Sequence, residues 1–291
     1  MPPGLPARVT EDAARLKKQL DGVVSTLRQA DLREAARHYP QAGGKAVRPV
    51  LTLLACEAAG GDPQRAEPLA LAVELLHTFS LVHDDLMDHD EVRRGVPAVH
   101  VQWDMPMAIL AGDALYALSF EQAARLAAYP GGSGVMMDLA TTARTLCEGQ
   151  TMDMAFEHDW PELATYETMI ERKTAALFAL STGGGARLAG ASDNIVEALA
   201  TFGLRLGLAF QVQDDVLDIT SDTETLGKPQ GSDILAGKKT HPIIAAHGKA
   251  TPRERERLEH LLEKGPGQDE AAWVLDLCER TGSIATSAVD S

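Results

Sequence analysis

An acidic stretch closes a long apolar helical run: Leu81-Val82-His83-Asp84-Asp85-Leu86-Met87-Asp88-His89-Asp90-Glu91-Val92-Arg93-Arg94-Gly95. At about 100° per residue, Asp84 and Asp88 lie one turn apart on one helix face, with Cβ atoms roughly 5–6 Å apart. Like charges at this spacing repel each other unless a cation lies between them. Carboxylate oxygens suit Mg²⁺, which keeps several waters and accepts phosphate oxygens as further ligands. His77 lies two turns earlier on the same face, so the pattern predicts a metal site beside it.

The same spacing recurs at Phe210-Gln211-Val212-Gln213-Asp214-Asp215-Val216-Leu217-Asp218, after a second long apolar helical pattern. Asp214 and Asp218 share one face, and Gly207 leaves room beside it two turns earlier. One motif of this kind is more often a solvated helix face than a metal site. Two of them, facing each other across a helical core, would form a cage for several divalent ions, and such a cage binds a diphosphate.

The order of the motifs resembles that of the trans-isoprenyl diphosphate synthases, the polyprenyl synthetases that include farnesyl and geranylgeranyl diphosphate synthases. The resemblance runs from Gly43 to about Ile284. Besides the two aspartate motifs and His77, it depends on Gly43-Gly44-Lys45-Ala46-Val47-Arg48-Pro49, Arg93-Arg94-Gly95, Gly149-Gln150-Thr151-Met152-Asp153, Lys173-Thr174, Gly227-Lys228, and Asp233 with Lys238-Lys239-Thr240. These motifs are specific as a set, although no single one is.

The composition predicts an all-α protein before any family is considered. Of the 291 residues, 45% are hydrophobic and 24% charged, so the chain can bury a sizeable core. Helix formers dominate, and β-branched residues that alternate with polar ones are scarce. The resemblance implies, more specifically, a single domain over residues 1–291, folded as an orthogonal helical bundle around a central cavity, with a C-terminus that is short for the family.

The apolar periodicity also predicts where the helices lie. Thr10 and Thr165 are the expected N-caps of two of them, and Gly183-Gly184-Gly185 is expected to end the helix that begins at Thr165. The region from Ser221 to Lys239 is expected to be a lid-like loop. The remaining helices are expected over 10–39, 47–59, 68–88, 107–129, 135–156, 193–218, 242–248, 252–264 and 269–280.

Charge, cysteines and hydropathy limit the partners and the compartment. A net charge of −15 argues against a general nucleic-acid surface, because phosphate binding requires positive charge. Cys56, Cys147 and Cys278 are an odd number of widely spaced cysteines, which favours reduced thiols in the cytoplasm. No charge-free run approaches the roughly 18 residues of a membrane span. We therefore expect a cytoplasmic protein without stable membrane insertion.

The resemblance implies a role for each motif residue. Lys45 and Arg48 begin a helix, where cations are poorly placed unless they hold an anion. The diphosphate of isopentenyl diphosphate is expected to bind Gly44, Lys45, Arg48, His77 and Arg94. The diphosphate of an allylic partner is expected to bind Arg93, Lys173, Lys228 and Lys238. About three Mg²⁺ ions, with Mn²⁺ as an alternative ion, are expected at Asp84, Asp85, Asp88, Asp214 and Asp218.

The implied reaction is the ionisation of the allylic diphosphate, followed by attack of the isopentenyl double bond. The residues expected to act in catalysis are Asp84, Asp214, Lys173, Thr174 and Gln211, and the last two are expected to direct oxygens toward the allylic cation. Phe79 and Ser80, about one turn before Asp84, are the expected determinants of chain length. An aromatic residue at position 79 favours a C20 over a C15 product.

Two other functions are compatible with parts of the pattern. A class I terpene cyclase also carries an aspartate-rich helix, but cyclases usually lack the second motif and the basic site for a second diphosphate. A non-catalytic partner subunit of a prenyl synthase is the other alternative, and the short C-terminus keeps it open. A homodimer is expected from the resemblance alone.

Overall fold

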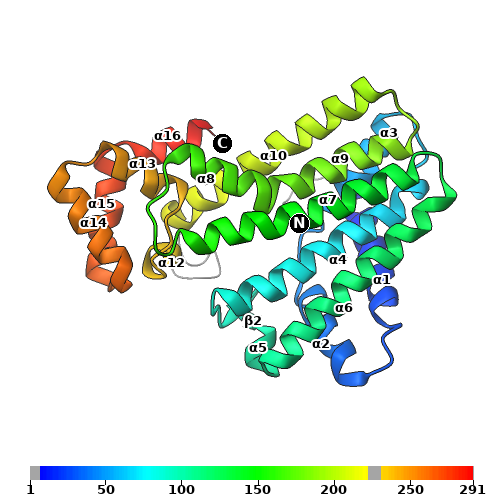
Figure 1. Ribbon diagram of the computed structural model, residues 1–291, viewed down its shortest axis with the longest axis horizontal. Helices are drawn as coiled ribbons and strands as arrows, with labels where there is room; N and C mark the ends of the chain where they lie inside the picture. The colour runs from blue at the N-terminus through cyan, green and yellow to red at the C-terminus, as the bar shows by residue number, and fades with distance from the viewer. Residues whose placement is uncertain (1–6, 222–230, 291) are drawn as a thin grey trace. The chain divides into compact units, whose positions relative to one another are not determined.

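The computed structural model describes residues 7–221 and 231–290, and in these ranges the regular secondary structure is helical apart from one two-stranded ribbon (Figure 1). This confirms the predicted all-α class. The helices are α1 (Ala7–Val24), α2 (Ala30–Ala42), α3 (Val47–Ala58), α4 (Pro63–Met87), α5 (Val99–Gln102), α6 (Met105–Ala124), α7 (Gly132–Ala155), α8 (Leu163–Ile170), α9 (Ala176–Leu188), α10 (Asp193–Thr220), α12 (Ser232–Leu235), α13 (His241–Lys249), α14 (Pro252–Lys264), α15 (Gln268–Arg280) and α16 (Ser283–Asp290). A 3₁₀ turn (Arg125–Ala128), a π-helical turn (Glu171–Ala175) and strands β1 (Val92–Arg93) and β2 (Val96–Pro97) complete the described elements.

The chain divides into two compact units. The first unit comprises Met1–Leu146 with Ala176–Leu204, and the second comprises Cys147–Ala175 with Arg205–Ser291. The first aspartate motif therefore belongs to the first unit and the second motif to the second unit. The single domain and the central cavity that the resemblance implies stay predictions.

In the first unit, α4 lies along α6, and α3 packs against α9 (Figure 1). Leu69, Leu75 and Leu76 of α4 are fully buried in its core. The helix begins at Pro63 rather than at the predicted Pro68, because Asp62 accepts a hydrogen bond from the Gln64 N–H at 3.0 Å and caps it.

Two predicted N-caps are wrong. Thr10 lies inside α1, whose first turn is anchored by an ion pair between Arg8 Nη1 and Glu57 Oε1 at 2.7 Å. Thr165 lies inside α8, which begins at Leu163, a side chain that packs on the Tyr166 cluster. In both cases the described helix already includes the threonine, so its side chain is not at the N-cap.

The glycines Gly183 to Gly185 do not end a helix, because α9 continues through them to Leu188. A Cβ atom at Gly185 would lie 2.4 Å from the Thr52 carbonyl oxygen, and one at Gly184 would lie 2.6 Å from a methyl group of Leu69. These glycines thus allow α9 to approach α3 and α4 closely, and the predicted helix end is wrong for that reason.

In the second unit, α13 packs against α15 and α16. Ile243, Leu258 and Val274 are fully buried between these elements and α14. A second cluster joins α8, α10 and α13 through Tyr166, Ile170, Val212 and Ile244. This cluster positions α8 against the turn of α10 that carries the second aspartate motif.

Candidate functional site

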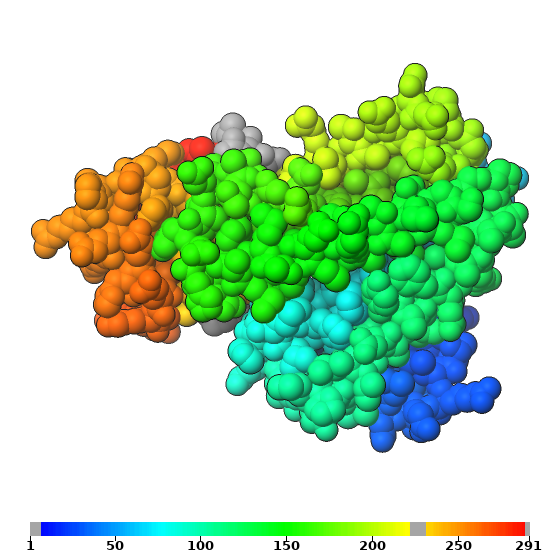
Figure 2. All heavy atoms as spheres, viewed as in Figure 1, coloured from blue at the N-terminus to red at the C-terminus, as the bar shows by residue number. Residues whose placement is uncertain are grey.

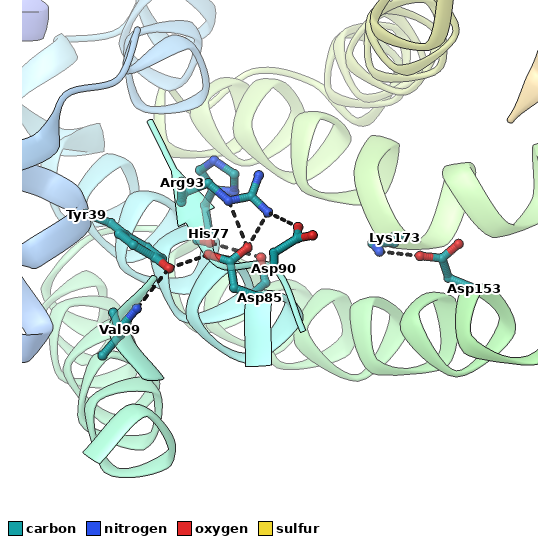
Figure 3. Close-up of polar contacts among 9 residues, drawn as sticks. Tyr39, His77, Asp85, Asp90, Arg93, Val99, Asp153 and Lys173 are labelled. Atoms are coloured by element: carbon teal, nitrogen blue, oxygen red, sulfur yellow. Dashed lines mark hydrogen bonds and ion pairs between the residues drawn. The ribbon is translucent and has the colours of Figure 1, made fainter. Parts of the chain in front are cut away.

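The first aspartate motif divides into two surface carboxylates and one buried carboxylate. Asp84 and Asp88 are partly exposed, and the Asp88 N–H donates to the Asp84 carbonyl at 2.7 Å, so the predicted spacing of one helical turn is confirmed. Asp85 is fully buried. Its Oδ1 accepts from Arg93 Nε at 2.8 Å and from Arg93 Nη2, and its Oδ2 accepts from the Tyr39 hydroxyl (Figure 3). The predicted ligand Asp85 is therefore closed off, whereas Asp84 and Asp88 reach the surface.

The two arginines that follow the motif lie on a tight hairpin, which no pattern in the sequence predicted. β1 and β2 pair antiparallel, and Arg94 and Gly95 between them have φ angles of 55° and 77°. Two positive φ values are typical of a type I′ turn, and at Arg94 this backbone is costly for a residue with a side chain. Such conformations gather at functional sites, where other contacts hold them. Here Arg94 Nη1 donates to the carbonyls of Tyr39, at 3.1 Å, and Gly43.

A cluster of cations surrounds His77 on α4. Arg48 Nη1 lies 3.2 Å from His77 Nε2, and its guanidinium carbon lies 4.4 Å from the centre of the Phe178 ring. Because arginine has no acceptor, Nε2 accepts this bond and the ring proton lies on Nδ1. Burial lowers the pKa of His77 well below its usual value, and the charges of Arg48, Arg94 and Arg93 lower it further. His77 is therefore neutral at pH 7.

Burial also lowers the pKa of Arg48 to about 10, although the charge of Glu74 acts against this shift. The guanidinium is still cationic at pH 7. Gly44 lies next to Arg94, because a Cβ atom at Gly44 would be 2.9 Å from Arg94 Nη1. Lys45 is exposed just before α3. The first unit thus brings Arg48 to His77 and Gly44 to Arg94, and cations that gather in this way suit an anion.

The second aspartate motif has one exposed carboxylate and two buried ones. Asp214 is exposed, whereas Asp215 and Asp218 are 3% and 1% exposed. Asp215 accepts from the Tyr166 hydroxyl at 2.5 Å, from Gln211 Nε2 at 3.1 Å and from the His241 N–H at 3.1 Å. Burial raises the pKa of Asp215 to about 7, against the effect of these hydrogen bonds.

Asp218 holds the start of α12. Its Oδ1 accepts from the Ser232 hydroxyl at 2.7 Å, and its Oδ2 accepts from the Asp233 N–H at 3.0 Å. The Asp218 carboxylate therefore caps the N-terminus of the short helix α12. Of the two ligands predicted in this motif, Asp214 reaches the surface and Asp218 is engaged within the protein.

Lys173 and Thr174 lie in the π-helical turn between α8 and α9, a feature that is frequent at functional sites. Lys173 Nζ pairs with Asp153 Oδ2 at 2.5 Å (Figure 3). Thr174 Oγ1 donates to Gln211 Oε1 at 3.0 Å, and Gln211 in turn donates to Asp215. The second unit thus joins Thr174 and Gln211 to Asp215 of the second aspartate motif through a hydrogen-bonded chain, whereas Lys173 pairs with Asp153.

Of the predicted lysines Lys228 and Lys238, the described residues include the second. Lys238 is exposed, and its N–H donates to the Asp233 carbonyl at 2.8 Å, just after α12. Lys228 lies outside the described residues.

Phe79 and Ser80, the predicted determinants of chain length, are partly buried on α4. The Phe79 ring meets His83 at 4.8 Å and Tyr116 at 4.9 Å between centroids, both edge to face. Tyr116 continues the row to Phe120. Phe79 is therefore the first ring of an aromatic row between α4 and α6, one turn before Asp84.

The exposed carboxylates suit an open Mg²⁺ site that other ligands complete. Within residues 7–221 and 231–290, no group of three or more His, Cys, Asp or Glu side chains is gathered as in a closed metal site. Mg²⁺ is usually held by one or two protein carboxylates, several waters and substrate phosphates. In the first unit, Asp84 and Asp88 fit an ion that is completed by a diphosphate. In the second unit, the exposed carboxylate of Asp214 fits the same kind of open site.

Three residues that hold the aspartates were not found from the sequence. Tyr39 precedes Asp85 by 46 positions, Tyr166 precedes Asp215 by 49, and Ser232 follows Asp218 by 14. No periodic pattern connects residues that far apart. In each motif a tyrosine pairs with the middle aspartate, but this pairing can be recognised only once the fold is known.

One described helix, α10, is long and apolar enough to cross a membrane by length and composition, although core helices of soluble proteins meet the same criterion. It carries Gln211 and the second aspartate motif, whose buried carboxylates are satisfied by protein donors. The expected absence of stable membrane insertion stays a prediction.

Comparison with known proteins agrees with the resemblance. The family model of polyprenyl synthetase matches residues 29–277, a range that includes both aspartate motifs. A short chain isoprenyl diphosphate synthase of Methanothermobacter thermautotrophicus is 46% identical over 263 residues, which cover 89% of this chain and 80% of that protein. A geranylgeranyl diphosphate synthase of Methanosarcina mazei is 44% identical over 79% of this chain and 72% of that protein. The crystal structure of geranylgeranyl pyrophosphate synthetase from Pyrococcus horikoshii Ot3 superposes with a TM-score of 0.92 at 40% identity, over 98% of this chain and 87% of that one.

Proposed function

The chain belongs to the polyprenyl synthetase family and is a prenyltransferase, and from that premise we propose that it condenses isopentenyl diphosphate with an allylic diphosphate, head to tail. The product is a short-chain all-trans prenyl diphosphate, and C20 is favoured over C15. The starter is dimethylallyl, geranyl or farnesyl diphosphate. The names of the Methanosarcina and Pyrococcus relatives support the C20 product.

One observation carries this proposal. The first unit holds a cation cluster around His77 and a surface pair of carboxylates two turns further along α4. Cations bind a diphosphate directly, whereas carboxylates bind one through a metal ion. A condensation needs both modes, because it brings together two diphosphates. A terpene cyclase ionises only one, so it has no use for the second site, and a silent subunit needs neither.

The proposed Mg²⁺ ions, about three, are held by Asp84, Asp88 and Asp214, with Mn²⁺ as an alternative ion. When bound, they act as Lewis acids that neutralise the leaving diphosphate. Asp85 and Asp218 are left out of this ligand set because both carboxylates are buried and bonded to protein donors. We assign them to the positioning of Arg93 and of α12.

The remaining residues bind and orient the substrates. Isopentenyl diphosphate binds Lys45, Arg48, His77 and Arg94. Because His77 is neutral, it provides a hydrogen bond and does not protonate the isopentenyl double bond. Arg93 and the lysines Lys173, Lys228 and Lys238 bind the allylic diphosphate. Thr174 and Gln211 stabilise the allylic cation with their dipoles. The C–C bond then forms, and the proton lost from the isopentenyl unit goes to the released pyrophosphate.

The homodimer is part of the proposal. α6 lies on the surface of the first unit (Figure 2). Its side chains Met105, Ile109 and Leu110 are 56%, 42% and 54% exposed, and an apolar helix face of this kind supports an interface between two copies. The proposed compartment is the cytoplasm, and the buried free thiols of Cys56 and Cys278 support it.

One assay tests the function against its alternatives. The protein is incubated with Mg²⁺, labelled isopentenyl diphosphate and each allylic starter in turn, and the dephosphorylated products are analysed by mass spectrometry. Elongation to C20 supports the proposal. A cyclised hydrocarbon formed without isopentenyl diphosphate would identify a cyclase, and the absence of turnover would favour a silent subunit.

A further inference from the structure

We propose that Tyr39 is a positioning residue that aligns Arg93 for the allylic diphosphate through Asp85, while its backbone independently aligns Arg94 for isopentenyl diphosphate. Tyr39 lies on α2, outside both aspartate motifs. The division of the two arginines between the two substrates is taken from the proposed function.

The Tyr39 hydroxyl joins three elements. Tyr39 is fully buried, its Oη donates to Asp85 Oδ2 on α4, and it accepts from the Val99 N–H of α5 at 3.3 Å (Figure 3). An ionised carboxylate only accepts and an amide only donates, so the direction of both bonds is set. Burial raises the pKa of Tyr39, and the hydrogen bond to Asp85 raises it further, so the donated proton is retained.

Asp85, which the Tyr39 hydroxyl holds in place, in turn orients the Arg93 guanidinium. Its Oδ1 accepts from Nε and Nη2 of Arg93, and a further bond joins Nη2 to Asp90 at 3.3 Å. Arginine has five N–H donors in a rigid fork, so among the described contacts the Nη1 protons are left to meet a further anion. The Arg93 side chain is 31% exposed and can reach one. Burial acts to lower its pKa, but the hydrogen bonds and charge of Asp85 outweigh this and raise it.

Arg94 depends on a different part of the same residue. Its Nη1 donates to the backbone carbonyl of Tyr39 at 3.1 Å and to that of Gly43. Replacement of the side chain leaves the carbonyl in place. The hydroxyl of Tyr39 thus orients Arg93 and its carbonyl orients Arg94. A variant that lacks only the hydroxyl should therefore affect Arg93 and leave Arg94 unchanged.

The Tyr39→Phe variant keeps the buried ring and removes only the hydroxyl. We expect KM for the allylic diphosphate to rise about tenfold, because a hydrogen bond to a charged group is lost, and KM for isopentenyl diphosphate to stay within about twofold. Tyr129→Phe removes a hydroxyl from the same unit but far along the chain from these contacts, and should change neither constant. A Tyr39→Phe variant that raises both constants equally, or neither, would overturn the proposal.

A double-mutant cycle separates positioning from general destabilisation. Arg93→Lys keeps a cation beside Asp85 and removes the guanidinium donors, so adding Tyr39→Phe should raise the allylic KM by less than about twofold more. Fully additive effects, accompanied by a lower thermal midpoint, would reduce Tyr39 to a structural role.

If the wild type does not elongate, the proposed function fails separately. Calorimetric binding of geranyl diphosphate with Mg²⁺ then replaces KM and still decides whether the hydroxyl matters.

Discussion

In the first aspartate motif the buried carboxylate of Asp85 meets the guanidinium of Arg93, whereas in the second motif Asp215 meets only neutral donors. Each also accepts from a tyrosine hydroxyl, Tyr39 and Tyr166 respectively. A cation compensates a buried carboxylate more than neutral donors do. Burial raises the pKa of Asp215 to about 7, although the hydrogen bonds from its neutral donors act against this shift. The comparison teaches that one spacing can recur in the sequence while tertiary partners give the middle aspartates different electrostatic surroundings.

The last aspartates of the motifs differ as well. α4 ends at Met87, so Asp88 follows the last helical residue and is partly exposed. α10 continues to Thr220, so Asp218 is still helical, and it is buried against the start of α12. The first motif therefore offers two surface carboxylates for a metal ion and the second offers Asp214.

The largest expected effect comes from the surface carboxylates. Asp84→Ala and Asp214→Ala should each lower turnover by about three orders of magnitude or more, because each removes a proposed metal ligand. Steady-state rates at saturating Mg²⁺ measure this, with circular dichroism to confirm folding. Asp269→Ala, at an exposed position in the first turn of α15, is the matched control. A near-normal rate for either variant would remove that aspartate from the ligand set.

The middle aspartates should differ in stability. Asp85→Asn removes the carboxylate that accepts two hydrogen bonds from Arg93 and leaves Asp90, at 3.3 Å, as the remaining described ion pair of the arginine. The free energy of unfolding should fall by about 2 kcal/mol, less than for a fully buried pair because the arginine is partly exposed. Asp215→Asn replaces a carboxylate among neutral donors and should cost about 1 kcal/mol. Urea unfolding of both variants measures the difference. Equal losses would mean that the cation beside Asp85 is immaterial.

The spacing of the aspartates could be read from the sequence because helical periodicity is local. Periodicity placed Asp84 and Asp88 one helical turn apart, as the structure confirms, and composition predicted an all-α chain. It could not show that Asp85 and Asp218 are buried, because their partners Tyr39 and Ser232 come from other elements. Burial of that kind is a property of the tertiary structure.

Local signals also proved ambiguous. A run of glycines is compatible with a helix end and with close helix packing, and at Gly183 to Gly185 the packing against α3 and α4 prevails. The hairpin that carries Arg93 and Arg94 has strands of two residues each, too short for any alternating pattern. The positions of these arginines therefore became clear only from the structure.

A third prediction concerns the helices that carry the motifs. Phe79→Ala on α4 should lengthen the product by one or more isoprene units, because it removes the first ring of the row that continues through Tyr116. Phe202 on α10 is 55% exposed, so Phe202→Ala is the matched control on the other motif's helix and should leave the product unchanged. Mass analysis of the dephosphorylated products compares them. If Phe79→Ala still gives the wild-type distribution, chain length is limited elsewhere.

The smallest expected effect tests how Asp218 is held. Ser232→Ala removes the hydrogen bond from the Ser232 hydroxyl to this carboxylate and leaves the one from the Asp233 N–H, at 3.0 Å, in place. The free energy of unfolding should fall by about 1 kcal/mol, and the elongation rate should change by less than about threefold, since Asp218 is not a proposed ligand. Ser133→Ala, exposed in the first turn of α7, should change neither quantity. A rate loss as large as that of Asp214→Ala would instead show that the buried aspartate takes part in metal binding, and the two motifs would then resemble each other more closely than their contacts indicate.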